Sequence, residues 1–287
     1  MKINRRINWI SSTHSSNELS KLELLLTDFY SNNEHYYKSI NFTEDNWIND
    51  AEKGYLQIVE IAKKCESICE VGCGGANILV HYPELQSKYT GLDFSKEQLE
   101  KNSKKFSSAK FETFIQPNQF PVQSQQFDFV FCVFVIEHVT RPQAFLNECK
   151  RVLKQNGILI ILCPDFLGKG RMTSQRAGFS EGTTREKIRL QKFFDAFVTL
   201  FDNRIRIPFY CFFYRVKALN VPKFYINLSP TVFVDSFMPD VDAVYLTYKK
   251  EMKAFLKKDF KEIGNSSQIK SYEKEKKIIF LQMQKLA

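Results

Sequence analysis

The sequence lacks any uninterrupted apolar stretch of about 18 residues, the length that a membrane-spanning helix needs. The most apolar long segment, 127–139, is interrupted by Asp128, Glu137 and His138. The N-terminus carries Arg5 and Arg6 but no apolar core after them, so it does not have the pattern of a secretory signal. These absences predict a cytoplasmic protein without a transmembrane segment.

A disulfide framework is also missing. The chain has 7 cysteines, an odd number, and they are scattered rather than grouped. This usage is typical of reduced thiols. Cys65, Cys69 and Cys73 are evenly spaced, but no histidine follows at the spacing of a zinc site. The sequence therefore predicts structural thiols and no metal site. Repeats of the kind found in solenoids and propellers are absent as well.

What is present is an ordinary globular composition with a basic surplus. Of 287 residues, 44% are apolar and 25% are charged, which excludes wholesale disorder. The 41 Lys and Arg exceed the 32 Asp and Glu, for a net charge of +9. Lysines gather near the C-terminus, and we expect them mainly to form a solvated surface. Peripheral membrane contact remains open. Nucleic-acid binding is disfavoured, because aromatic-rich strings such as that over 209–214 are more typical of a core.

Strands and helices alternate from residue 65 onward. The pattern predicts strands over 67–71, 89–93, 110–115, 127–133 and 157–163, with helices over 76–81, 96–105 and 142–153. This alternation is typical of a parallel sheet covered by helices on both faces. Two helices are expected before it, one capped by the Ser15–Glu18 pattern and one over 44–64. A helix over 242–258 and strands over 260–263 and 276–283 are expected after it.

These elements suggest four segments. A helical leader covers 1–43, a nucleotide-binding core covers 44–163, and an inserted cap covers 164–239. A C-terminal helix and the closing strands of the core follow over 240–287. Because the leader and the cap lie outside the regular alternation, we expect substrate choice to depend on them.

The clearest chemical signal is the run Glu70-Val71-Gly72-Cys73-Gly74-Gly75, where a strand ends and a helix begins. Glycines there let a ligand approach the backbone, and a helix N-terminus offers unpaired N–H groups. In an open α/β sheet such a loop lies where ligands bind. Asp93 ends the next strand, where a carboxylate can accept hydrogen bonds from both hydroxyls of a ribose.

A dinucleotide-dependent oxidoreductase is an alternative that this loop fits less well. The dinucleotide pattern Gly-x-Gly-x-x-Gly/Ala requires glycine or alanine at the position that Asn77 occupies. The carboxylate of Glu70 would also repel a pyrophosphate, whereas it suits a ligand with a cationic portion. The Walker pattern of proteins that bind nucleoside triphosphates is absent.

Five stretches together carry a family resemblance, in order and spacing across about residues 55–165. They are Glu70–Gly75, Gly91-Leu92-Asp93-Phe94-Ser95, Phe127-Asp128-Phe129-Val130, Ile136-Glu137-His138-Val139, and the run from Arg151 to Gly157. The sequence resembles the class I S-adenosylmethionine-dependent methyltransferases of the small-molecule group called type 11. The resemblance implies a Rossmann-like sheet of seven strands, mostly parallel with the last strand antiparallel, and S-adenosyl-L-methionine as the cofactor.

The resemblance also implies roles for residues of the glycine loop and its neighbour strand. Gly72, Cys73 and Gly74 would pass beside the methionine and ribose portions of the cofactor. Glu70 would lie close to the methionine ammonium group, and Asp93 would bind the ribose hydroxyls.

The resemblance also places two aromatic residues in the cofactor site. Phe94 would lie against the adenine, and Phe134 would lie near the sulfonium. The family usually has an acidic residue in the loop after the third strand, where this chain has Gln116-Pro117-Asn118. An amide at Gln116 can still accept a hydrogen bond from the adenine amino group, with Asn118 beside it. This departure keeps a second alternative open, a non-catalytic nucleic-acid-binding or scaffold protein on a degenerate methyltransferase fold.

Methyl transfer needs mainly alignment of the acceptor, the methyl group and the sulfur. A general base is needed only when the acceptor is a weakly nucleophilic O–H or N–H. Glu137 and His138 follow the fourth strand, and Asp165 follows the fifth, so these three are the candidate catalytic residues. Asp242 and Tyr245, at the expected start of the C-terminal helix, are weaker candidates. The expected substrate is a small molecule, a sugar or a lipid-linked intermediate, whereas the sequence specifies neither the acceptor atom nor the oligomeric state.

Overall fold

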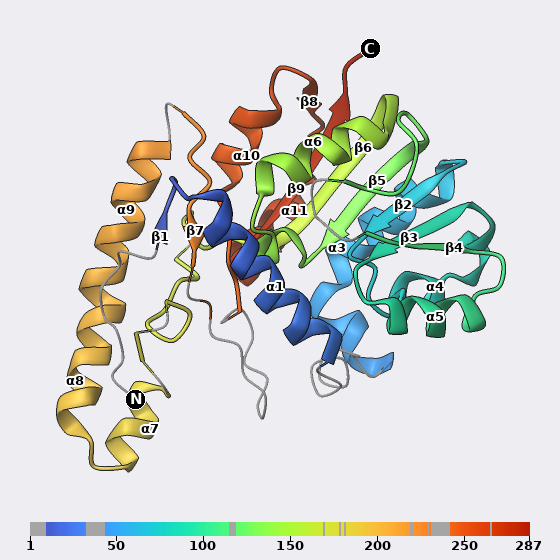
Figure 1. The fold of residues 1–287 in the computed structure, drawn as a ribbon. Coiled ribbons are helices and arrows are strands. Elements are labelled where there is room, and N and C mark those ends of the chain that lie inside the picture. The colour runs from blue at the N-terminus through green and yellow to red at the C-terminus, as the bar shows by residue number, and fades with distance from the viewer. Residues whose placement is uncertain are drawn as a thin grey trace.

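The computed structural model describes residues 10–32, 44–114, 119–168, 170–177, 179–180, 182–218, 221–228, 230, 242–264 and 266–287. Its centre is a seven-stranded sheet in the order β4-β3-β2-β5-β6-β9-β8 (Figure 1). The strands are β2 (Ile68–Val71), β3 (Tyr89–Asp93), β4 (Lys110–Thr113), β5 (Phe127–Val133), β6 (Leu153–Pro164), β8 (Phe260–Glu262) and β9 (Ile278–Lys285). Only β9 runs antiparallel to its two neighbours, β6 and β8. The predicted fold class is thereby confirmed.

Helices cover the sheet on both faces. Alternate side chains of its strands point in opposite directions, so they are buried in two separate cores. In β5, Val130 and Cys132 belong to one apolar core, while Phe129 and Phe131 belong to the other. The first core packs beneath α1 (Ser16–Asn32), α6 (Pro142–Val152) and α10 (Lys249–Leu256). The second packs beneath α3 (Glu44–Lys64), α4 (Asn77–His81), α5 (Lys96–Lys105) and α11 (Ser267–Lys276).

Local sequence signals account for the limits of several elements. Ser95 caps α5, since its hydroxyl accepts a hydrogen bond from the backbone N–H of Gln98. Before α1, Ser15 and Glu18 bond to each other's backbone N–H groups, as the capping pattern predicts. Short 3₁₀ turns follow α4 and β5, namely η2 (Pro83–Lys88) and η3 (Ile136–His138). The predicted bounds of β3, β5, α3 and α5 agree with the structure.

The C-terminal part differs from its prediction in two ways. The helix expected over 242–258 begins only at Lys249, because the preceding residues are held extended by backbone bonds. The N–H groups of Val244 and Tyr245 both donate to the carbonyl of Glu137. Asp242 and Tyr245 therefore precede α10 instead of starting it. In addition, α11 stands between β8 and β9, a helix that the sequence pattern did not predict.

The segment between β6 and α10 contains a helical arm rather than irregular structure. It comprises α7 (Thr184–Arg189), α8 (Phe193–Phe201), the π-helical turn η4 (Asp202–Arg206) and α9 (Ile207–Ala218). A third apolar cluster, which includes Phe166, Phe179 and Tyr248, joins this arm to the rest of the molecule. The leader is connected to the same segment, because β1 (Ile10–Ser11) pairs with β7 (Ile226–Asn227). The four-segment division itself stays a prediction.

No helix in the described part of the chain is both long enough and apolar enough to cross a membrane.

Candidate functional site

The glycine loop between β2 and α4 has a backbone that side chains would not tolerate. Gly72 has a φ of +72°, and a Cβ built on it would lie 2.4 Å from a methyl group of Val135. The N–H groups of Gly72 and Cys73 both donate to the carbonyl of Leu92, at 2.7 and 3.1 Å. The loop is therefore pinned to the end of β3 at one side and to the segment after β5 at the other. Glycine is required at position 72 because φ is positive and because a Cβ would clash with Val135.

Gly74, in contrast, faces open space. Its φ is +47°, and a Cβ built on it would meet no atom within 4 Å. Its N–H donates to Asp93 Oδ2 at 2.9 Å, and its carbonyl accepts from the side chain of Asn102 at 2.7 Å. The loop is thus supported by β3 and α5, and it leaves room above Gly74 beside a carboxylate. The resemblance predicts the ribose and methionine portions of S-adenosylmethionine at this position.

Asp93 lies at the carboxyl end of β3 and is 5% exposed. Burial raises the pKa of its carboxyl, although the backbone N–H groups of Ser95 and Gly74 oppose that effect. Oδ1 accepts from Ser95 N at 3.0 Å, and Oδ2 accepts from Gly74 N. A carboxylate oxygen can accept more than one hydrogen bond. Asp93 therefore holds the loop and retains acceptor capacity for the predicted ribose hydroxyls.

Glu70 and Cys73 have buried side chains. The Glu70 carboxyl is enclosed and accepts a hydrogen bond of 2.5 Å from the hydroxyl of Tyr89. Burial raises its pKa to about 8, against the opposing effect of that hydrogen bond. The Cys73 thiol is buried too, 2.8 Å from the position of a Cβ on Gly91. The predicted contact between Glu70 and the methionine ammonium stays a prediction.

The buried Glu70 carboxyl predicts a pH dependence of stability. Between about pH 4.5 and about pH 8 the unfolded chain has lost this proton while the folded chain retains it. Because the unfolded state then binds fewer protons, the free energy of unfolding falls as the pH rises through this range. One pKa unit corresponds to about 1.4 kcal/mol, so the decrease is expected to amount to several kcal/mol.

Denaturant unfolding at about pH 5 and about pH 8 measures this effect. Glu70→Gln keeps an oxygen that accepts from Tyr89 and is expected to be less sensitive to pH than the parent. Glu97→Gln, at an exposed glutamate of α5, is the control. Its free energy of unfolding is expected to change with pH as much as that of the parent. If the free energy of unfolding of Glu70→Gln depended on pH as strongly as that of the parent, another group would be responsible.

A second cluster of polar side chains connects the leader, η3 and the segment before α10. The Tyr30 hydroxyl donates to Asp242 Oδ2 at 2.6 Å and lies 2.9 Å from His138 Nδ1. Asp242 Oδ2 and His138 Nδ1 are 3.6 Å apart. The Tyr30 ring also packs against Phe94, with 5.6 Å between ring centroids. His138 is thus linked through Tyr30 to Phe94, which directly follows β3 and is predicted to lie against adenine.

The other candidate catalytic side chains are more enclosed. Glu137 is 2% exposed, and its Oε1 lies 3.9 Å from His138 Nε2. Asp165 is 3% exposed and accepts from Gly168 N at 2.8 Å. A Cβ on Gly168 would lie 2.5 Å from both carboxylate oxygens of Asp165, so this carboxylate fills a tight turn. The geometry favours a structural role for Asp165 and a place beside His138 for Glu137.

The remaining predicted residues differ in how far the structure describes them. Phe134, directly after β5, is 37% exposed and has a φ of +54°. Its N–H donates to the carbonyl of Leu162, which fixes the turn near the glycine loop. Gln116 and Asn118 lie outside the described residues, so the adenine-recognising residue stays a prediction.

Two residues that the sequence pattern did not indicate belong to these clusters, Tyr30 and Asn102. Leu22, Leu26 and Tyr30 are buried and follow one another at four-residue intervals on α1. This helical spacing could have marked Tyr30 as an inward-facing polar side chain. No comparable signal exists for Asn102, whose contact with Gly74 spans 28 residues.

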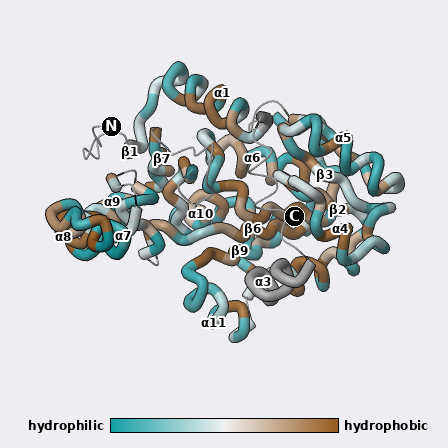
Figure 2. The backbone as a smooth tube through the Cα atoms, turned by 90° about the horizontal axis from the view of Figure 1, so that it is seen from below, coloured by the Kyte–Doolittle hydropathy of each residue, from teal (hydrophilic) through white to brown (hydrophobic). Residues whose placement is uncertain are grey.

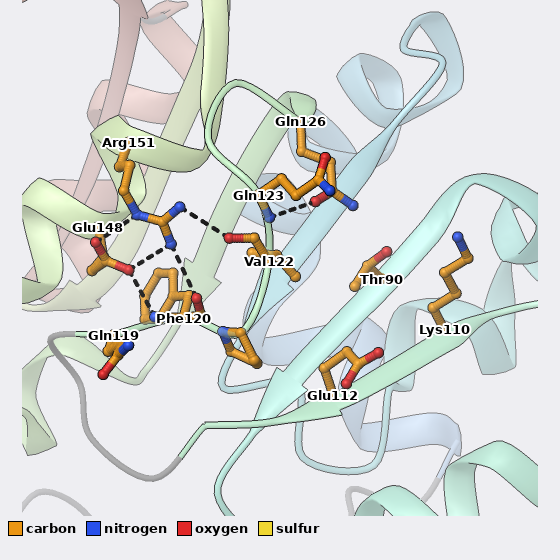
Figure 3. Close-up of a pocket in the computed structure, with 11 residues that line it drawn as sticks. Thr90, Lys110, Glu112, Gln119, Phe120, Val122, Gln123, Gln126, Glu148 and Arg151 are labelled. Carbon is orange, nitrogen blue, oxygen red and sulfur yellow. Dashed lines mark hydrogen bonds and ion pairs between the residues drawn. The ribbon is translucent and has the colours of Figure 1, made fainter.

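A separate hollow of about 890 Å³ lies at the other end of β3 and β4. Figure 3 shows Arg151 bound to Glu148 and to the carbonyls of Phe120 and Val122, with Lys110 and Glu112 on the opposite wall. Neither the glycine loop nor Asp93 lines this hollow. It is therefore distinct from the candidate cofactor site.

The 7 cysteines all carry free thiols. Among the described residues, no group of three or more His, Cys, Asp and Glu side chains is arranged to hold a metal ion.

Comparisons with known proteins match the same part of the chain. A family model described as a methyltransferase domain matches residues 69–161. The ubiquinone biosynthesis O-methyltransferase of Actinobacillus pleuropneumoniae is 26% identical over 151 residues, which cover 50% of this chain and 62% of that protein. The protein of the same name from Psychrobacter cryohalolentis is 25% identical over 134 residues, covering 42% and 52%. The match thus spans little more than half the length of these relatives.

One solved structure shows the fold over nearly the whole chain. It is the 1,6-didemethyltoxoflavin-N1-methyltransferase of Burkholderia thailandensis, solved with S-adenosylhomocysteine. The TM-score is 0.52 at 11% identity, and the match covers 96% of this chain and 92% of that one. The family match, the strand order and the glycine loop agree: residues 69–161 form a methyltransferase domain, and the chain has the fold and the sequence motifs of the class I S-adenosylmethionine-dependent methyltransferases.

Proposed function

We propose that this protein transfers a methyl group from S-adenosylmethionine to a hydroxyl oxygen of a small molecule, a sugar or a lipid-linked intermediate. The observation that carries the proposal is the Tyr30–His138–Asp242 cluster, because it provides a proton acceptor next to the predicted adenosine-binding residues. The names of the curated relatives, which are O-methyltransferases, support oxygen as the acceptor atom.

In this proposal, Gly74 and Asp93 hold the cofactor, with Phe94 against its adenine and Phe134 near its sulfonium. When bound, the cofactor supplies an electrophilic methyl group on a positively charged sulfur. The chain's own contribution is largely geometric: the pinned loop fixes the position of the ligand above Gly74.

His138 is proposed to accept the proton of the acceptor hydroxyl. Since the Tyr30 hydroxyl donates to Asp242, its oxygen has lone pairs available to accept from His138 Nδ1–H. That tautomer leaves Nε2 as the proton acceptor. Glu137 Oε1, 3.9 Å from Nε2, stabilises the imidazolium that forms. Tyr30 and Asp242 act as positioning residues that set the ring orientation.

A thermal-shift experiment tests the cofactor assignment. S-adenosylmethionine and its demethylated product are expected to raise the melting temperature, because a ligand that binds only the folded state stabilises it. NAD and NADP are expected to leave it unchanged. A shift with NAD alone would favour the oxidoreductase alternative, and no shift with any nucleotide would favour the non-catalytic alternative.

A further inference from the structure

The helical arm carries a continuous row of exposed apolar side chains. Residues 193–218 form one uninterrupted run of helix through α8, η4 and α9. Ten large apolar side chains recur along it at steps of one, three or four residues, each between 42% and 76% exposed. We call this row the outer stripe, and it consists of Phe193, Phe194, Phe197, Leu200, Phe201, Ile205, Phe209, Phe212, Phe213 and Val216.

A different face of the same helix attaches the arm to the molecule. Ala196, Thr199, Asp202, Ile207 and Cys211 are buried there. The five-residue step from Asp202 to Ile207 falls at the π-helical turn η4, which keeps the buried residues on the inner side. Packing within the protein therefore accounts for the inner residues and leaves the outer stripe unexplained.

The outer stripe is too large to be an incidental feature of a monomer surface. A phenylalanine or a larger aromatic buries about 150–250 Å² when covered, whereas the largest apolar patch on a typical monomer is about 300–600 Å². Seven of the ten side chains are phenylalanines. Patches of this size mark sites that bind another surface.

The charge around the outer stripe is positive. Arg185, Arg189, Lys192, Arg204 and Lys217 are exposed in the arm, whereas Glu186 and Asp195 are its exposed acidic residues among those described. The occupant of the surface must therefore combine an apolar layer with negative charge. A two-fold contact between two copies would place each stripe against itself and bring the basic side chains together, which disfavours that occupant.

An anionic lipid bilayer has the required combination. Interfacial helices insert aromatic and aliphatic side chains at the boundary between headgroups and acyl chains, and their Lys and Arg side chains bind anionic headgroups. The arm is also accessible, since α8 and α9 lie at the end of the molecule farthest from α4 and α5 (Figure 1). Figure 2 shows hydrophobic segments alternating with hydrophilic ones along α8 at this outer end.

We propose that the outer stripe binds the surface of an anionic lipid bilayer, without any segment crossing it. The phenylalanines enter the headgroup region, and the five exposed basic side chains contact lipid phosphates. The run of 26 helical residues is about 39 Å long, so the contact extends along the plane of the membrane. This inference goes beyond the proposed methyl transfer and does not depend on it.

Vesicle flotation with the full chain tests the proposal. The protein is expected to float with phosphatidylglycerol vesicles, to bind phosphatidylcholine vesicles at least about tenfold more weakly, and to be partly released by salt. Phe194→Ser combined with Phe197→Ser is expected to weaken binding by about tenfold or more, since both rings are mostly exposed and their loss should not affect folding. The matched control is Leu56→Ser on α3, which removes an exposed apolar side chain on another face.

The charge contribution has its own pair of variants. Lys192→Glu with Arg189→Glu is expected to weaken binding by at least about fivefold per residue. Lys257→Glu with Lys258→Glu, after α10, makes the same change of net charge away from the arm and is expected to have a smaller effect. Equal losses in both pairs would show that net charge alone is responsible and would overturn the assignment to the arm. So would absent vesicle binding, or a stable dimer that the Phe194 and Phe197 substitutions dissociate.

Discussion

Replacing Asp93 with alanine is expected to weaken S-adenosylmethionine binding by about a hundredfold or more. The carboxylate is predicted to accept hydrogen bonds from both ribose hydroxyls, and a hydrogen bond to a charged group contributes about 1.5–3 kcal/mol. Two such bonds correspond to at least about 3 kcal/mol, or about two powers of ten in affinity. The substitution also removes the acceptor for Gly74 N, so the loop loses part of its support.

Isothermal titration calorimetry measures the affinity, and Asp128→Asn separates binding from stability. Asp128 is also a carboxylate that supports backbone, since it accepts from Ser67 N at 2.9 Å. It is the second residue of β5 and lies at the amino ends of the parallel strands, whereas Asp93 lies at their carboxyl ends, so its loss is expected to leave cofactor affinity unchanged. If Asp93→Ala bound the cofactor as tightly as the parent, the predicted ribose contact would be wrong.

The sheet was predictable because its signals are local. In β5, consecutive side chains alternate between two apolar cores, and the run Phe127–Val133 carries that apolarity in the sequence itself. The start of α5 depends on Ser95, a capping residue that can be recognised three positions from its partner. Where local propensity and burial agree, the pattern predicts the element and its limits.

The segment before α10 was not predictable from such signals. Val244 and Tyr245 are held extended by the carbonyl of Glu137, which lies more than a hundred residues earlier in the chain. The arm was hidden for another reason. Apolar side chains form its outer stripe and also part of its inner face, where Thr199 and Asp202 are buried beside them, so the helix lacks the exposed polar face by which amphipathic helices are recognised.

The residues of the candidate site also differ in how far the sequence predicts them. The glycine loop and Asp93 are neighbours in a βα unit whose spacing is recognisable from the sequence. The second cluster joins residues that are distant in sequence, since Tyr30 is 108 residues from His138 and 212 residues from Asp242. Only the folded chain brings these three together. His138 and Asp242 could be selected as separate candidates from the sequence, whereas their connection through Tyr30 could not.

Replacing His138 with alanine is expected to lower kcat by about 100- to 10,000-fold, the usual contribution of a general base. Cofactor affinity should stay near the parent value, because the hydrogen bond from Tyr30 to Asp242 and the contact between Tyr30 and Phe94 do not require the imidazole. The parent's kcat should fall on acidification, since a protonated imidazole cannot accept the hydroxyl proton, and the variant should lose that dependence.

The Tyr30→Phe substitution tests the positioning role of Tyr30. Tyr30→Phe keeps the ring that packs against Phe94 but removes the oxygen 2.9 Å from His138 Nδ1. It is expected to lower kcat less than His138→Ala and to shift the pH profile of the rate, whereas a purely structural tyrosine would leave that profile in place. His81→Ala, at the end of α4, is the matched histidine control and should retain full activity. A His138→Ala enzyme with the parent's kcat would mean that the acceptor needs no base, and that alignment above the glycine loop is the main contribution of the chain to the reaction.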